Sequence, residues 1–86
     1  MTENLITVKV KLFAIYQEVY QREEITLSLA SETQIKQVLD LINQEKPELN
    51  KWRNLTRLAV NFDFVSEDYL LKNGDEIALI PPVSGG

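Results

Sequence analysis

A single amphipathic helix, expected between residues 35 and 46, sets the strongest limit on how this sequence can fold. Its apolar positions recur at helical spacing and form one stripe: Ile35, Val38, Leu39 and Ile42. Either Ser31 with Gln34, or Thr33 alone, is expected to cap its start. Pro47 should mark its end within a residue or two, because the residue before a proline avoids helical angles. In a single domain of 86 residues, this helix must cover the core formed by the rest of the chain.

Segments on both sides of the helix alternate between apolar and polar residues, and this pattern predicts strands. They span residues 7–13, 24–29, 58–61 and 76–80. The inward-facing residues are expected to be Val8, Val10, Leu12, Ile25, Leu27, Leu29, Leu58, Val60, Ile77 and Leu79. The first two strands should pair antiparallel, and a very short strand is expected at Phe64-Val65.

Local signals complete the expected order of elements. Residues 14–22 favour a short helix, and Leu49 and Trp52 should cover the end of the main helix. Asn73-Gly74 indicates a tight turn because both residues tolerate positive φ. The fold class is therefore α+β: a β-grasp (ubiquitin-like) roll with a mixed sheet and one main helix packed on one face. Its first and last strands should lie side by side, with residues 1–81 as the domain and 82–86 as a projecting tail.

Charge and composition exclude several kinds of function. Nine basic and thirteen acidic residues give a net charge of −4, which disfavours a nucleic acid partner. The absence of Cys and His rules out disulfides, thiolate nucleophiles and imidazole catalysis, and no metal site is expected. No apolar run approaches the ~18 residues of a membrane span. Met1 to Leu5 also lacks the features of a signal peptide, so a cytoplasmic location and no membrane association are expected.

The last six residues carry the strongest functional signal: Pro81-Pro82-Val83-Ser84-Gly85-Gly86. Two prolines donate no hydrogen bonds, so strand pairing should stop there, and their stiffness should keep the tail extended. Val83 can anchor in an apolar pocket, and Gly85 and Gly86 can pass through a channel too narrow for a Cβ. Fully extended, residues 82–86 would reach ~16–18 Å beyond the fold. The group delivered at that end is the α-carboxylate of Gly86.

A carboxylate is a poor electrophile and needs activation, for which adenylation by ATP is the general solution. The sequence contains no glycine-rich phosphate-binding motif. We therefore expect the chain itself to bind no cofactor, and ATP to be used by a partner adenylating enzyme.

Two segments near the end of the chain resemble the small subunit of molybdopterin synthase, the MoaD family. They are Asn73-Gly74-Asp75-Glu76-Ile77 and Ile80-Pro81-Pro82-Val83-Ser84-Gly85-Gly86. The opening strand running into Leu12-Phe13-Ala14 and the segment Ala59-Val60-Asn61 are also similar, whereas residues 45–56 depart from the family pattern. The double glycine is shared with ubiquitin, thiazole-pathway sulfur carriers (ThiS type) and ubiquitin-related modifiers, and Pro-Pro-Val favours the molybdopterin member.

The resemblance implies that Gly86 is adenylated by an E1-like enzyme (MoeB type) and then converted to a thiocarboxylate with sulfur from a donor protein. The tail, Pro81 to Gly85 with its terminal Gly86, would insert into the large synthase subunit (MoaE type). There it would give sulfur to cyclic pyranopterin monophosphate during molybdenum cofactor biosynthesis. A heterotetramer with two large subunits is also implied. The chain would not be an enzyme by itself, only the sulfur-donating subunit of one.

A partner surface is expected beside the tail. Ile80 has the opposite parity to Ile77 and Leu79, so it should face away from the helix, where it could join Phe64, Val83 and Phe13 in an exposed apolar patch. Two other functions remain open: a ubiquitin-like modifier joined through Gly86 to target lysines, and a binding module that never uses its terminus. Covalent conjugates would support the first, and full activity after extension beyond Gly86 would support the second.

Overall fold

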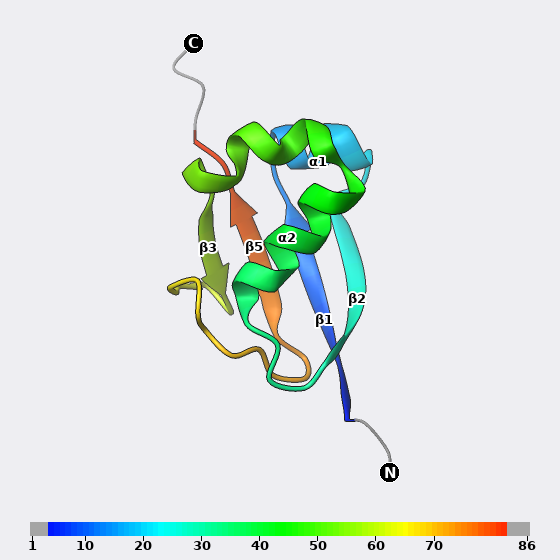
Figure 1. The fold of residues 1–86 in the computed structure, drawn as a ribbon, viewed down its shortest axis with the longest axis vertical. Helices are drawn as coiled ribbons and strands as arrows, with labels where there is room; N and C mark the ends of the chain where they lie inside the picture. Colours follow the sequence, from blue (N-terminus) through cyan, green and yellow to red (C-terminus); the bar gives the residue numbers. More distant parts are fainter. Residues whose placement is uncertain (1–3, 83–86) are drawn as a thin grey trace.

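A computed structural model describes residues 4–82, which form one mixed sheet with helices over one face and one end (Figure 1). The strands are β1 (Leu5–Leu12), β2 (Glu24–Ala30), β3 (Arg57–Val60), β4 (Asp63–Phe64) and β5 (Glu76–Ile80). The helices are α1 (Ile15–Tyr20), α2 (Ile35–Glu45) and the 3₁₀ helix η1 (Pro47–Leu55). This is the predicted order of elements, with the short strand one residue earlier than expected.

The strand order of the sheet is β2-β1-β5-β3-β4. β1 pairs antiparallel with β2 and parallel with β5, so the first and last strands are neighbours, as predicted. β3 pairs antiparallel with both β5 and β4. A mixed sheet with this central parallel pair and one helix across it is the β-grasp arrangement, and the predicted fold class is confirmed.

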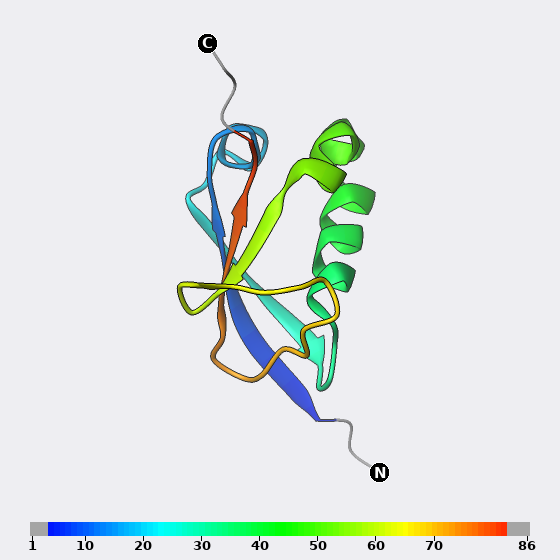
Figure 2. The ribbon, with the colours of Figure 1, turned by 90° about the vertical axis from the view of Figure 1, so that its left-hand side faces the viewer.

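The core lies between α2 and one face of the sheet, which we call the covered face (Figure 2). All four residues of the predicted helical stripe are buried there, as are the inward residues of β1, β3 and β5. Ile25 and Leu27 are only partly buried, because β2 is an edge strand. We call the opposite side of the sheet the open face, since α2 and η1 both lie on the other side (Figure 2).

The helix cap differs from the prediction. Gln34 is the N-cap of α2, and its backbone N–H donates to Gln37 Oε1 over 2.8 Å. Thr33 instead donates its hydroxyl to the Ala30 carbonyl oxygen over 2.6 Å. Capping by Ser31 or by Thr33 was therefore wrong, because the turn after β2 uses the Thr33 hydroxyl before the helix begins.

The end of α2 is covered as predicted. α2 ends at Glu45, and Pro47 starts η1, which buries Leu49 and packs Trp52 against the core. Tyr16 of α1 is also fully buried, and its hydroxyl lies 2.6 Å from Thr56 Oγ1. Burial raises the pKa of Tyr16, so its phenol stays protonated. These contacts hold α1 and η1 at the end of the sheet where β5 finishes (Figure 1).

Candidate functional site

The chain leaves the sheet at the end of β5, where the tail was predicted to begin. The final rung of the ladder pairs Ile80 with Arg57, and the strand stops before Pro81. Pro81 is buried and Pro82 is exposed. The rest of the predicted tail, Val83 to Gly86, lies outside the described residues, so its role stays a prediction.

An apolar groove of about 620 Å³ lies beside this exit point. It is formed where the start of α1, η1 and the end of β5 meet, and it is lined by Phe13, Ala14, Ile15, Glu18, Trp52, Ile80, Pro81 and Pro82. The two prolines that lead into the tail are thus part of an apolar surface. The sequence prediction did not include Trp52 or Ala14 in the site.

A second groove, of about 680 Å³, crosses the open face of the sheet. Its apolar lining residues are Leu12, Phe13, Ala59, Phe62, Phe64, Ala78 and Ile80, and its charged and polar ones are Lys11, Gln17, Glu23 and Glu76. Phe13 and Ile80 line both grooves, so the two form one continuous surface from the tail exit to β4. The predicted grouping of Ile80, Phe64 and Phe13 is therefore found in the structure, while its fourth member, Val83, lies outside the described residues.

Phe64 is 60% exposed, and one face of its ring is covered by Arg57. The guanidinium carbon of Arg57 lies 4.2 Å from the ring centroid, a favourable cation–π arrangement. The register places Phe64 opposite Ala59 and Arg57 opposite Ile80, so all four project from the open face. The apolar patch thus carries a positive charge at its edge.

The charged residues of the open face are partly paired. Lys11 Nζ lies 3.0 Å from Glu24 Oε1 on the neighbouring strand. Their hydrogen bond lowers the pKa of the Glu24 carboxyl and raises the pKa of the Lys11 ammonium. Lys9 projects from the same strand and is exposed. The pair keeps the groove's β1 side charged over a broad range of pH.

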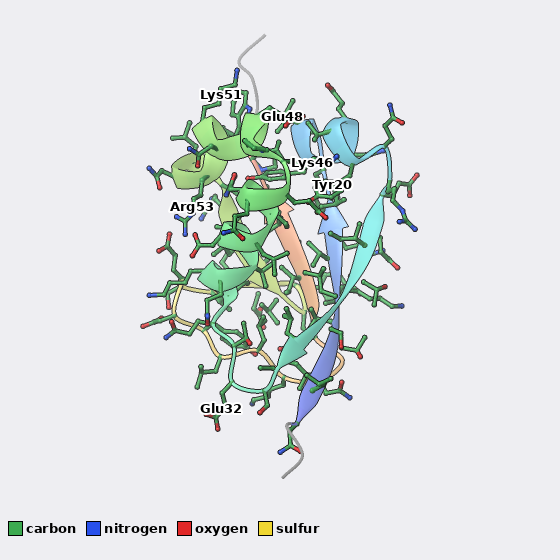
Figure 3. All side chains as sticks on the ribbon, turned by 45° about the vertical axis from the view of Figure 1, so that its right-hand side comes forward. Tyr20, Glu32, Lys46, Glu48, Lys51 and Arg53 are labelled. Carbon is green, nitrogen blue, oxygen red and sulfur yellow. The ribbon has the colours of Figure 1, made fainter. Side chains whose placement is uncertain are left out.

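The polar contacts on the helical side of the molecule are structural. Tyr20 donates to Glu45 Oε1 over 2.7 Å, and Lys46 Nζ lies 5.5 Å from the Tyr20 ring centroid (Figure 3). Burial is the main cause that strongly raises the pKa of Tyr20, and the hydrogen bond to Glu45 raises it further. Arg53 of η1 binds Asp40 of α2 over 2.6 Å. Lys46 and η1 therefore brace α2 on the side of the sheet opposite the open-face groove.

Within residues 4–82, no group of three or more His, Cys, Asp or Glu side chains is arranged to hold a metal ion. None of the helices in that part of the chain is long and apolar enough to cross a membrane.

Phe62 is a further site residue that the sequence prediction missed. The sequence analysis assigned no role to Phe62, yet Phe62 lines the open-face groove and is 92% exposed. A signal was present, since Asn61 tolerates positive φ and ends the strand predicted at 58–61, which in the structure already stops at Val60. A tight turn at Asn61-Phe62 would have placed this ring on the open face.

The chain matches the family model described as ThiS family over residues 10–86. Relatives called molybdopterin synthase sulfur carrier subunit include one from Arabidopsis thaliana, 32% identical over 94% of this chain and 84% of the relative. One from Dictyostelium discoideum is 36% identical over 91% of this chain and 94% of the relative.

Solved structures share the fold. A Pyrococcus furiosus chain assigned as molybdopterin converting factor subunit 1 has a TM-score of 0.79 and 26% identity, covering 91% of this chain and 99% of that one. The complex of subunits 1 and 2 of the Helicobacter pylori molybdopterin-converting factor contains a chain with a TM-score of 0.62 and 29% identity, covering 94% of this chain and 100% of that one.

A small archaeal modifier protein 1, from Methanosarcina acetivorans, has a TM-score of 0.75 and 28% identity, covering 96% of this chain and 99% of that one. The matching family model, the β-grasp sheet and relatives aligned over most of their length agree: the chain belongs to the ThiS family of ubiquitin-like proteins, which includes the MoaD-type carriers.

Proposed function

We propose that this protein is the sulfur-carrier subunit of a molybdopterin synthase. The observation that carries the proposal is the 32–36% identity to such subunits over more than nine-tenths of the chain. The family match extends to residue 86 and so includes the double glycine. The position of Pro81 at the end of β5, beside a continuous apolar surface, supports a tail that enters a partner protein.

The proposed chemistry takes place at the Gly86 α-carboxylate. A carboxylate oxygen attacks the α-phosphate of ATP on an E1-like enzyme, and pyrophosphate leaves. The outer sulfur of a donor protein's persulfide then attacks the acyl-adenylate carbon, and the carbon–oxygen bond to AMP breaks, which gives an acyl disulfide. A second thiol of the partner proteins attacks the donor sulfur and breaks the S–S bond, which leaves a thiocarboxylate on Gly86 and a disulfide on the partners. In the large subunit the sulfur passes to cyclic pyranopterin monophosphate, and water restores the carboxylate. The carrier supplies the sulfur, and the partners supply the nucleotide and substrate sites.

Deletion of Gly86 tests this proposal. The deletion moves the carboxylate back by ~3.3–3.6 Å, and a misplacement of ~1 Å can cost ~100-fold in rate at a tuned site. We expect thiocarboxylate formation to collapse while the domain stays folded. The measurement is intact mass after incubation with the adenylating enzyme, ATP and a sulfur donor, in which the wild type gains the mass of sulfur for oxygen.

The matched control adds one residue before Met1, far from the reactive carboxylate in sequence, while the test variant adds one residue after Gly86. The N-terminal extension should load normally, and the C-terminal extension should not, because its reactive group becomes an amide. Normal molybdopterin synthesis by the Gly86 deletion would contradict the proposal and leave a plain binding module.

A protein modifier is the second candidate, and the similarity to the Methanosarcina modifier favours it. It needs the same activated terminus but joins it to lysines. Gly86-dependent covalent conjugates in cell lysate would support this function, whereas a free pool carrying only thiocarboxylate would support the carrier.

A further inference from the structure

Phe62 occupies a backbone conformation that is unfavourable for its side chain. Asn61 and Phe62 have φ of 51° and 76° and connect the paired residues Val60 and Asp63, so they form a two-residue hairpin with positive φ at both positions. Glycine or asparagine suits the second position, whereas a bulky residue there is a genuine outlier. The Phe62 ring is also 92% exposed, so it gains little from burial within this chain. Folding alone therefore gives no reason for a phenylalanine at this position.

A hydrogen-bonded network holds the hairpin against β5. The Asn61 side chain accepts from Glu76 N–H over 3.0 Å and donates to Asp75 Oδ1 over 3.0 Å. The Asn61 backbone N–H donates to the Glu76 carbonyl oxygen over 2.9 Å. The buried Asp75 accepts a further bond from Lys72 N–H over 2.8 Å through its other oxygen. The strained turn is thus fixed from two sides, which is typical of a residue that must be presented in one orientation.

The hairpin projects from the open face of the sheet, away from α2 (Figure 2). Phe62 and Ile80 line the same groove, and Ile80 also lines the groove at the tail exit. The hairpin follows Val60, which pairs with Ile77, so it lies about three residues, or roughly 10 Å, from Ile80 along β5. β4 also lies two strands, or roughly 10 Å, to the side of β5. A standard interface covers about 800 Å² on each partner, a patch roughly 30 Å across. A partner that covers the open-face groove from Ile80 to Phe62 spans a distance within that size and therefore reaches the hairpin.

We propose that Phe62 is an anchor that inserts into an apolar socket on the large subunit that receives the tail, with Asn61 and Asp75 as its positioning residues. This inference rests on the proposed function and adds a contact to it at the far end of the open-face groove. Aromatic anchors contribute strongly to interfaces because a rigid ring buries a large area at low entropic cost. A partner docked on the tail exit makes this contact without a second docking site. A net charge of −4 argues against an anionic membrane as the occupant.

The experiment compares Phe62→Gly with wild type for affinity to the molybdopterin synthase large subunit of the same organism, measured by calorimetry. Glycine keeps the positive φ without strain, so the urea midpoint should not fall. Affinity should fall about 10- to 30-fold, as for an interface hot spot. Phe62→Tyr keeps the ring and should bind within about threefold of wild type. Leu41→Ala, which removes an apolar side chain from the exposed side of α2, should bind as wild type.

Four outcomes overturn the inference. Wild-type affinity in Phe62→Gly removes the anchor but leaves the carrier function standing, provided that Gly86 still acquires sulfur. A lower urea midpoint with unchanged affinity assigns the ring a structural role. Self-association lost in Phe62→Gly, with the large subunit still bound normally, makes a second copy of this chain the occupant. A wild-type chain that neither binds the large subunit nor acquires sulfur removes the proposed function and this inference together.

Discussion

The two faces of the sheet are built from the same strands but meet different demands. Two successive rungs of the β1–β2 ladder illustrate this: Val10 lies opposite Ile25, and Lys11 lies opposite Glu24. The first pair contributes to the core under α2, while the second is a solvent-accessible ion pair. Side chains alternate along a strand, so one residue of spacing separates core from surface.

The difference extends to the aromatic residues. On the covered face every large apolar side chain has packing partners, whereas Phe62 and Phe64 are mostly exposed on the open face. Packing density constrains the first set. The exposed Phe62 and Phe64 lower the solubility of the isolated domain and add little to its stability. Binding to a partner therefore explains these two side chains better than folding does. Stability and recognition are thus divided between the two faces of one sheet.

Truncation on the covered face should give the largest effect on folding. Leu39 is 1% exposed beneath α2, and Leu39→Ala should lower the free energy of unfolding by about 2–5 kcal/mol through lost burial and a cavity. The measurement is urea denaturation followed by circular dichroism. In a small domain with roughly 5 kcal/mol of stability, much of the population could unfold.

Leu41→Ala is the matched control for Leu39→Ala, because Leu41 lies on the same helix and is 41% exposed. Its free energy of unfolding should stay within about 0.5 kcal/mol of that of the wild type. Equal midpoints for the two variants would show that α2 does not cover the sheet as described.

Charges introduced on the open face should weaken partner binding and leave the stability of the domain nearly unchanged, the reverse of what is expected for Leu39→Ala. Phe64→Asp and Ile80→Asp should weaken binding to the large subunit about tenfold or more, or ~1.4 kcal/mol, because a charge must be desolvated against an apolar partner. Stability should change little, since Phe64 is largely exposed and Ile80 only partly buried. Calorimetric titration and a urea midpoint for each variant check both halves. Normal complex formation by both variants would remove these residues from the interface.

The covered face was largely predictable from the sequence. The α2 stripe, the inward residues of β1, β3 and β5, and the pairing of the first and last strands follow from apolar periodicity and element order. The cap of α2 was not predictable, because Thr33 and Gln34 both carry suitable side chains. The turn geometry decided that Thr33 binds Ala30 while Gln34 begins the helix.

The site was predictable only in part. Parity placed Ile80 on the open face, where Phe64 was expected to join it, and the structure brings both into one groove. The position of Phe62 depends on a left-handed turn stabilised by Asn61 and Asp75, which are 14 residues apart. Asn61 by itself hints at the turn, but its contact with Asp75 leaves no pattern in the local sequence. The chemistry assigned to Gly86 comes from the tail motif and the family, and loading experiments remain its test.

The smallest effect is expected at the Lys11–Glu24 pair on the open face. The folded state lowers the pKa of the Glu24 carboxyl below its ordinary value of 4.5. The stability that the ionised carboxylate adds to the fold is therefore complete above that pH and is lost as the pH falls through the lowered pKa. The pKa of Lys11 is raised above 10.5, so its contribution is present below that pH and is lost as the pH rises through the raised value.

Glu24→Gln should therefore reduce the urea midpoint slightly at about pH 7 and not at a pH below the lowered pKa of Glu24, where the wild-type carboxyl is also protonated. Because both side chains are more than a third exposed, water and salt screen the pair, and 1 M salt should remove the difference. Glu32→Gln, in the exposed turn before α2 (Figure 3), is the control and should leave the midpoint unchanged at both values of pH. A loss of stability in Glu24→Gln as large as that in Leu39→Ala would show that the open face also contributes to folding. That result would contradict the division of stability and recognition between the two faces.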